Sequence, residues 1–237
     1  MRTVLDILDS LPDVTQPAVG IPSAGDRVYT YDQLDSMVTT LGGTLQSYGL
    51  SSESLVAIAP TARSEMVIST LAVLATGATV RVSPPAKAPV DAVVGPSDVV
   101  SQYIAPSDAL ELVYDTASDG QLDYKEAVTQ TVDTLRTTAV RPNTTALTDG
   151  EITATHADIA ETVSSLSADD RFTTGAEVMI RAPLTDPRTI AAGVLTPLAA
   201  GCTLRLASGD GIVGDLAVTL NRAPEDRLFL IVDVPFD

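Results

Sequence analysis

Residues 54–85, SLVAIAPTARSEMVISTLAVLATGATVRVSPP, decide the fold class of this chain. The apolar run SLVAIAP predicts a buried strand, RSEMVISTLAVLATG predicts a helix that ends at Gly77, and ATVRVSPP predicts a strand that prolines terminate. Strand, helix and strand in this order are typical of a right-handed crossover between neighbouring strands of a parallel sheet. We therefore predict an α/β fold with mainly parallel sheets flanked by helices.

The same alternation continues on both sides of this stretch. Apolar periodicity predicts helices at residues 1–13, 31–49, 124–136, 156–167 and 187–201. Continuous apolar runs predict strands at 18–23, 26–31, 91–96, 109–115, 177–183, 202–207, 215–220 and 227–235, the first two forming a hairpin. A polar, turn-rich stretch at 137–151 separates two similar halves. We predict subdomains at residues 1–140 and 141–237 that form one compact unit.

The charge of the chain is unusually negative. Its 237 residues carry 31 acidic against 14 basic side chains, a net charge of −17, and only two lysines, Lys87 and Lys125. Such a surface repels nucleic acid and anionic membranes, so neither is an expected partner. Few lysines and many aspartates are typical of proteins from a salt-saturated cytoplasm, where salt screens carboxylate repulsion. We predict a halophilic protein, the alternative being an ordinary acidic one.

Targeting and disulfide signals are weak. The first 13 residues alternate apolar and acidic side chains, which favours a short amphipathic helix over a signal peptide. No apolar stretch reaches the length of a membrane span. Cys202 has no second cysteine to pair with and lies in an apolar run, which predicts a buried residue of a strand. We expect a soluble, cytoplasmic protein.

The order of these segments resembles the N-terminal part of the adenylate-forming enzymes, the superfamily of acyl-CoA synthetases, luciferases and peptide-synthetase adenylation domains. Residues 29–85 are similar to the opening of the family, and the second half adds ITATHADI and GVLTPLAAGCTLRL. The positions that match in the first half are Tyr31, Leu34, Gly49, Gly77, Ala78 and Pro84. The resemblance implies enzymes that join a carboxylic acid to AMP from ATP and then transfer the acyl group to CoA.

A polar stretch before the Thr-His pair holds the position of the family's phosphate-binding loop. The resemblance implies a loop rich in Ser, Thr and Gly with one lysine, because phosphate binding requires accessible backbone amides, hydroxyl donors and a cation. Counted back from His156, the glycines would fall at Thr144, Leu147 and Glu151, and the lysine at Gly150. The candidate residues of a remnant site are Thr144, Thr145, Thr148 and Gly150.

This loop has lost its lysine and gained two carboxylates, Asp149 and Glu151. Each would repel a triphosphate by roughly 1 kcal/mol or more at contact range. We therefore expect poor binding of ATP or AMP and assign no cofactor. A polar loop in which Thr155 caps the next helix explains the same residues without a ligand.

Other parts of the family pattern are missing. Thr185 stands where the resemblance implies a histidine or aromatic residue of the acyl pocket, and the similarity fades after Leu206. We predict a truncated, non-catalytic homologue that acts by binding or by association, either as a homo-oligomer or with a synthetase-like partner. The alternatives are a split ligase completed by another chain and a sensor of acyl groups or nucleotides.

Three further patterns have simpler interpretations. Residues 115–126, DTASDGQLDYKE, approach a calcium loop, but Ala117 removes one ligand and a strand precedes the loop where an entering helix is required. Residues 209–214, GDGIVG, have the glycine spacing of a dinucleotide loop, but a strand follows them. His156 is the only histidine and is expected to pack or cap at a helix start. None of the three predicts a metal or cofactor site.

Overall fold

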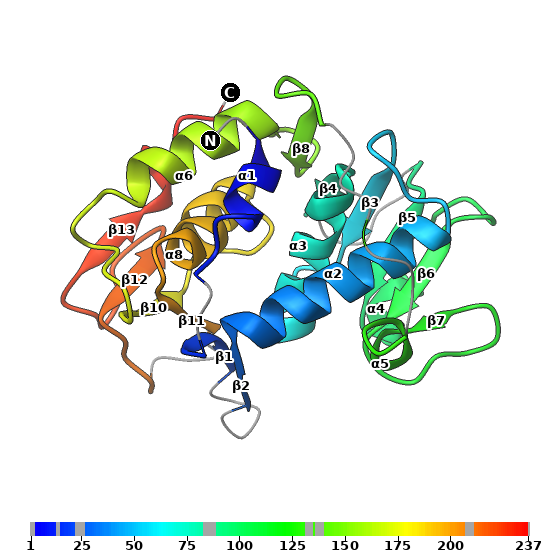
Figure 1. The fold of residues 1–237 in the computed structure, drawn as a ribbon, viewed down its shortest axis with the longest axis horizontal. Coiled ribbons are helices and arrows are strands. Elements are labelled where there is room, and N and C mark those ends of the chain that lie inside the picture. Colours follow the sequence, from blue (N-terminus) through cyan, green and yellow to red (C-terminus); the bar gives the residue numbers. More distant parts are fainter. Residues whose placement is uncertain are drawn as a thin grey trace.

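The computed structural model describes residues 3–12, 15–21, 27–82, 89–130, 135, 140–206 and 211–236. Within these ranges the strands form two sheets, seen side by side in Figure 1. The first sheet has the order β13-β12-β10-β11-β1-β2, and the second has the order β7-β6-β5-β3-β4-β8-β9. All strand pairs are parallel except the hairpins β1–β2 and β8–β9. The predicted α/β class is confirmed.

The strands of the first sheet are β1 (Pro17–Ile21), β2 (Arg27–Thr30), β10 (Glu177–Ile180), β11 (Thr203–Leu206), β12 (Leu216–Thr219) and β13 (Leu228–Leu230). Those of the second are β3 (Leu55–Ile58), β4 (Thr79–Arg81), β5 (Ala92–Gly95), β6 (Leu110–Val113), β7 (Leu122–Asp123), β8 (Thr145–Thr148) and β9 (Thr153–Thr155). The α-helices are α1 (Val4–Leu8), α2 (Tyr31–Ser47), α3 (Ser64–Thr76), α4 (Ser97–Val100), α5 (Tyr124–Ala127), α6 (His156–Leu166), α7 (Pro187–Thr189) and α8 (Thr196–Ala199). A π-helix, η2 (Ile190–Leu195), and a 3-10 helix, η3 (Ile231–Asp233), complete the described elements.

The crossover at residues 54–85 forms as its sequence predicts. Strands β3 and β4 pair in parallel with Val56 opposite Val80, and α3 connects them. Every residue of α3 except its second is buried, which explains why this helix is apolar all round. The helix ends at Gly77, whose φ of 84° lies in the left-handed region that glycine adopts without strain.

Each sheet takes strands from both sides of residue 140. The N-terminal hairpin β1–β2 joins the first sheet through β11, where Val19 lies opposite Leu204. The hairpin β8–β9 joins the second sheet through β4, where Leu147 lies opposite Val80. A division of the chain at residue 140 would therefore leave strands of each proposed subdomain in the sheet of the other.

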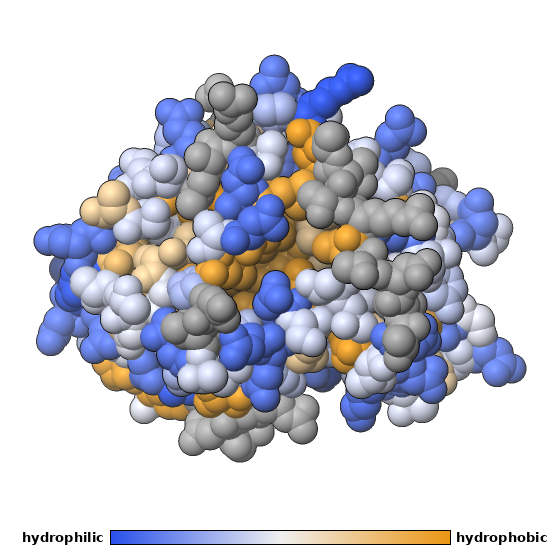
Figure 2. All heavy atoms as spheres, viewed as in Figure 1, coloured by the Kyte–Doolittle hydropathy of each residue, from blue (hydrophilic) through white to orange (hydrophobic). Residues whose placement is uncertain are grey.

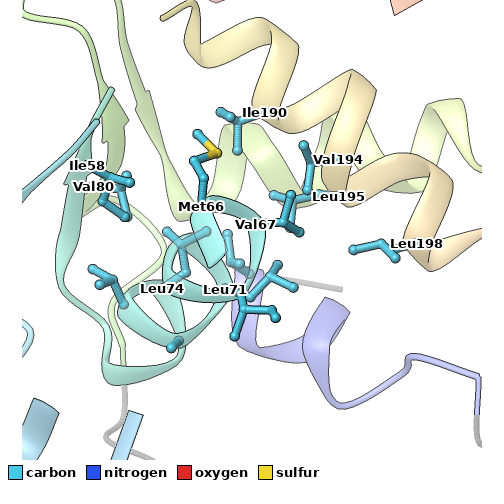
Figure 3. Packing of buried hydrophobic residues seen from close by; sticks show 14 of the residues in the cluster. Ile58, Met66, Val67, Leu71, Leu74, Val80, Ile190, Val194, Leu195 and Leu198 are labelled. Carbon is cyan, nitrogen blue, oxygen red and sulfur yellow. The ribbon is translucent and has the colours of Figure 1, made fainter. Parts of the chain in front are cut away.

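The two sheets share one apolar core. Figure 1 shows α3 and the η2–α8 segment between the sheets, and Figure 3 shows their side chains facing each other. Met66 and Val67 of α3 lie beside Ile190 and Val194 of η2, and all four belong to a single cluster of buried residues. Burial of each such side chain contributes about 1.5–3 kcal/mol, so this interface holds the two sheets together.

The predicted helix at 187–201 is not one regular α-helix. Residues Ile190–Leu195 form a π-helix between α7 and α8. An unbroken α-helix would require Pro197 to donate a backbone hydrogen bond to Gly193, and proline has no amide hydrogen. The Thr196 hydroxyl instead donates to the Ala191 carbonyl at 2.9 Å. A widened turn therefore accommodates the proline while the segment remains buried.

Three predicted elements are shorter than expected, and these predictions were wrong in length. The helix predicted at 1–13 is α1, Val4–Leu8, and residues 9–12 are not helical. The helix at 124–136 ends at Ala127, where the Thr129 hydroxyl donates to the Lys125 carbonyl at 2.7 Å and competes with further helical bonding. Residues 131–134 and 136–139 lie outside the described part. The strand at 227–235 ends at Leu230 and continues as a 3-10 helix in which Val232 is exposed.

Candidate functional site

The stretch predicted to hold a remnant phosphate loop is a β-hairpin followed by a helix. Thr145 to Thr148 form β8, Thr153 to Thr155 form β9, and residues 149–152 make the turn between them. The expectation of one polar, turn-rich loop at 137–151 is therefore wrong for its last part, because β8 completes the second sheet beside β4. The Thr155 side chain caps α6 and accepts the Asp158 amide, as its place before the helix predicts.

All four backbone amides of the turn make hydrogen bonds within the loop itself. The Glu151 and Ile152 amides donate to Asp149 Oδ1 at 2.8 and 2.7 Å, and the Gly150 amide donates to Thr148 Oγ1 at 3.0 Å. The Asp149 amide donates to the Ile152 carbonyl at 3.2 Å. The Asp149 side chain thus closes the turn by local hydrogen bonds, and none of the four turn amides is left without a partner.

The four residues proposed for a remnant site lie at two ends of this hairpin. Thr148 and Gly150 are in direct contact at the turn. Thr144 lies before β8, where its hydroxyl donates to the Arg141 carbonyl at 2.7 Å. Thr145 opposes Thr155 at the other end of the ladder, and its carbonyl accepts the Thr79 hydroxyl at 2.9 Å. The structure therefore brings together Thr148 and Gly150, with Thr144 and Thr145 one strand length away.

The spacing of residues along the sequence did not reveal that Arg81 lies beside the turn. A methyl group built on Gly150 would lie 3.1 Å from Arg81 Nη2, so the Arg81 guanidinium lies against this glycine. The pKa of Arg188 is raised mainly by hydrogen bonding to Asp186, and the charge of Asp149 adds a smaller electrostatic contribution. Because β4 and β8 are adjacent, the register of the sheet is what places Arg81 here.

A cleft of about 570 Å³ opens beyond the carboxyl ends of β10, β11 and β12. Ligands of open parallel sheets bind at this edge. Its lining combines apolar residues from the ends of these strands with Pro60 and Ala62, which follow β3 in the second sheet. Pro183 and Leu184, which the sequence resemblance likens to an acyl-pocket motif, also line it, and Thr185 follows them directly.

Two arginines line this cleft in different states. Arg181 forms an ion pair with Glu225, with Nη2 2.5 Å from Oε1, and donates to the Ile212 carbonyl at 2.6 Å. The Glu225 side chain is fully buried, so this pair fixes residues 220–225 against the end of β10. The Arg222 side chain is exposed at the cleft. Among the described residues that line the cleft, Arg222 is therefore the exposed cation, whereas the charge of Arg181 is neutralised by Glu225.

His156 begins α6 and is completely buried, which confirms its predicted place at a helix start. Neither ring nitrogen makes a hydrogen bond of ordinary geometry within the described ranges. Burial lowers the pKa of His156 to about 4, and the backbone of Gly77 offsets this only in part. The side chain is therefore neutral at pH 7 and packs in the core.

The calcium-loop-like stretch at 115–126 and the glycine-rich stretch at 209–214 remain to be placed in the structure. Asp115 Oδ1 accepts the Ser97 amide at 2.8 Å, and Asp123 caps α5. Within the described ranges no group of three or more His, Cys, Asp or Glu side chains is arranged to hold a metal ion. Gly209 and Asp210 of the GDGIVG stretch lie outside the described residues, and β12 follows the stretch as predicted.

None of the described helices is long and apolar enough to cross a bilayer.

Solved structures of other proteins share this fold. Three solved structures match at TM-scores of 0.73, 0.72 and 0.69: the anthranilate CoA ligase AuaEII with anthranoyl-AMP, MbtA of Mycobacterium smegmatis, and ATP-bound MatB of Rhodopseudomonas palustris. The chain has the fold of the N-terminal part of acyl-CoA ligases. Sequence identities are 14%, 16% and 16%, and 91%, 91% and 92% of this chain are covered.

The chain spans about half the length of these structures, since the matches cover 49%, 47% and 49% of them. A scan against protein-family models finds no matching family. A search of curated proteins finds no matching relative. The acyl-CoA-ligase fold is therefore retained at a sequence identity that carries no functional residue across by itself.

Proposed function

We propose that this chain is a non-catalytic homologue of AMP-dependent acyl-CoA ligases that acts by binding or by association with a partner. The observation that carries this proposal is the bonding of the turn at 149–152. Its four amides are engaged within the loop, two of them by the Asp149 carboxylate. A phosphate oxygen would have to displace a carboxylate that is already held by charge-assisted hydrogen bonds.

Electrostatics support the same conclusion. Asp149 and Glu151 place two negative charges at the turn, whereas Arg81 lies against Gly150 as a compensating cation. Arg81 already makes other interactions, so its charge is shared. Unless the turn rearranges, Mg-ATP meets both an occupied amide cradle and carboxylate repulsion of roughly 1 kcal/mol or more for each group.

Calorimetry with Mg-ATP in multimolar potassium chloride tests the proposal. We expect no binding at millimolar nucleotide for the natural chain. Gly150 has a φ of 105°, so a lysine there would be strained, and the cation is better introduced at the next residue. The variant Asp149→Gly with Glu151→Lys frees two amides and adds a cation, and its affinity should rise at least about tenfold.

The control keeps the charge change but leaves the amides occupied. Glu151→Lys alone, with Asp149 retained, should gain less than the double variant. Micromolar binding by the natural chain would contradict the proposal and favour a split adenylate-forming ligase that a second polypeptide completes. Equal affinities of the two variants would show that charge alone limits nucleotide binding.

A second candidate function is a sensor of carboxylic acids or their adenylates. It is favoured by the cleft beyond β10, β11 and β12, which has apolar walls and the exposed cation Arg222. A non-hydrolysable acyl-adenylate analogue and the free acid are the appropriate probes. Binding that is lost in Arg222→Gln and kept in Arg227→Gln would support the sensor, because Arg227 is also exposed but does not line the cleft.

The setting of the protein is part of the proposal. The net charge of −17 supports a salt-rich cytoplasm and argues against nucleic acid or anionic membranes as partners. Association would be as a homo-oligomer or with a synthetase-like protein. Light scattering after size-exclusion chromatography in high salt tests self-association. A clean monomer would contradict the homo-oligomer and leave association with a synthetase-like protein.

A further inference from the structure

One wall of the cleft is a short loop between β12 and β13. Asn221, Arg222, Ala223 and Pro224 of this loop all line the cleft. The cleft shares no lining residue with the hollow between α1 and α2, whose apolar floor is seen in Figure 2. Among the described lining residues the loop supplies the exposed cation, Arg222. The position of the loop therefore decides where the cleft can bind an anionic group.

The loop is held at both of its ends. At its beginning, the Asn221 amide donates to Thr219 Oγ1 at 3.2 Å, where β12 ends. At its other end, the Glu225 carboxylate is paired with Arg181, with Oε1 2.5 Å from Nη2 and Oε2 2.8 Å from Nε. The Glu225 side chain is completely buried, whereas Arg222, three residues earlier, is exposed. The ion pair is the stronger anchor, because charge-assisted hydrogen bonds are roughly twice as strong as neutral ones.

Arg181 is itself fixed by its neighbours. Its amide donates to the Val218 carbonyl at 2.9 Å, which ties its backbone to β12 directly after β10 ends. Its guanidinium also donates to the Ile212 carbonyl at 2.6 Å. The side chain is nearly buried, and Glu225 neutralises its charge. Arg181 lines the cleft, but these contacts suit it to hold the loop and not to bind a ligand directly.

We infer that Arg181 and Glu225 are positioning residues of the cleft, which hold Arg222 where it binds the anionic group of a small amphipathic ligand. The inference rests on the second proposed function, in which the cleft binds a carboxylic acid or its adenylate. A cation on a fixed loop loses less conformational entropy when it binds than a cation on a mobile loop. The pair therefore contributes to affinity through Arg222, without a contact to the ligand.

A double-mutant cycle tests whether the pair acts through Arg222. Calorimetry with hexanoate, in the lowest salt that preserves the fold, compares the natural chain, Arg222→Gln, the pair variant Arg181→Met with Glu225→Leu, and their combination. Removal of both charges avoids an unpaired buried charge, and such replacements are often tolerated. We expect the affinity to fall about tenfold in Arg222→Gln and in the pair variant, and no further in the combination. Hexanamide, which has no charge, should bind all four chains equally.

The matched control is the ion pair between Arg205 and Glu177, neither of which lines the cleft. Arg205→Met with Glu177→Leu removes the same two charges and should leave the affinity for hexanoate unchanged. Circular dichroism checks the fold of each variant. If the pair variant does not fold, Arg181→Lys takes its place, because lysine keeps the charge but cannot make the bidentate contact. It should lose affinity for hexanoate and none for hexanamide.

The outcomes separate this inference from the proposed sensor. Additive losses in the cycle, or equal losses for hexanoate and hexanamide, would overturn the inference, because the pair would then only stabilise the fold. Unchanged hexanoate affinity in the pair variant, with a loss in Arg222→Gln, would overturn the inference and leave the sensor intact. Absence of hexanoate binding by the natural chain would overturn both.

Discussion

Arg181 and Glu225 form a buried ion pair in which Nη2 lies 2.5 Å from Oε1, and their side chains are 9% and 0% exposed. The Arg181 Nε also lies 2.8 Å from Oε2, so the contact is bidentate. Arg181 follows β10 directly, and Glu225 precedes β13. The pair therefore joins the loop at 220–225 to the end of a central strand, beside the cleft.

Removal of one member should leave a buried charge without its partner. We expect Glu225→Gln to lower the free energy of unfolding by about 3–5 kcal/mol. The matched control is Glu177→Gln, which breaks the more exposed pair with Arg205 and should cost at most about 1 kcal/mol. Urea unfolding followed by circular dichroism measures both. Equal losses would mean that burial does not set the strength of the Arg181 pair.

The Tyr31 hydroxyl connects α2 to the first sheet. It lies 2.7 Å from the carbonyl oxygen of Cys202 and 3.1 Å from that of Leu198, and the residue is buried. Tyr31→Phe should cost about 1–2 kcal/mol in unfolding free energy, because a buried acceptor loses its donor. Tyr48→Phe is the control and should be neutral, since Tyr48 is exposed. Equal small effects would contradict this role.

Gly77 and Gly49 distinguish backbone strain from a steric clash. Both have positive φ, 84° and 96°, so alanine is strained at either position. A methyl group at Gly77 would lie 2.7 Å from Val140 Cγ2, whereas nothing lies within 4 Å at Gly49. We expect Gly77→Ala to cost about 1–3 kcal/mol more than Gly49→Ala. Thermal unfolding compares them, and equal costs would indicate that only φ matters.

Buried His156 should make stability depend on pH. Its pKa falls from 6.5 to about 4 on burial, so the unfolded chain binds a proton between these values and the folded chain does not. The stabilisation is complete above pH 6.5 and is lost as the pH falls towards 4, by about 3 kcal/mol at most. His156→Leu should flatten this part of the profile of unfolding free energy against pH. An unchanged slope in the variant would refute the assignment.

The net charge of −17 should make stability depend on salt. Potassium chloride shortens the range of repulsion between surface carboxylates, from about 10 Å at 0.1 M to about 3 Å at 1 M. We therefore expect the melting temperature to rise steeply between dilute buffer and multimolar salt. An unchanged melting temperature after dialysis into low-salt buffer would contradict the prediction of a halophilic protein.

The sequence predicts the elements better than it predicts their partners. Strand β3, helix α3 and strand β4 follow from apolar runs and Gly77, because these signals are local. The pairing of β1 with β11 depends on contacts between Val19 and Leu204, far apart in the chain, and no local pattern encodes it. The π-helix lies just before Pro197, whose missing amide hydrogen marks an irregularity in the predicted helix but does not specify a π turn.

At the candidate site, too, the residue types can be predicted from the sequence, whereas their contacts cannot. The carboxylates Asp149 and Glu151 can be recognised from the spacing to His156, and they led to the expectation of poor nucleotide binding. That Asp149 accepts two amides of its own turn is a three-dimensional property. Arg81 is a neighbour of Gly150 only because β4 and β8 are adjacent, so spacing along the chain could not place it there.

The pairing of β1 with β11 also constrains how the chain folds as it is synthesised. Val19 leaves the ribosome long before its partner Leu204 does. Until then β1 of the hairpin has an unpaired edge, and the apolar side chains of α3 that face η2 are not covered by it. Such distant pairings are slow to form and expose the nascent chain to aggregation. The first sheet can therefore form only after β11 has been synthesised and pairs with β1 of the hairpin.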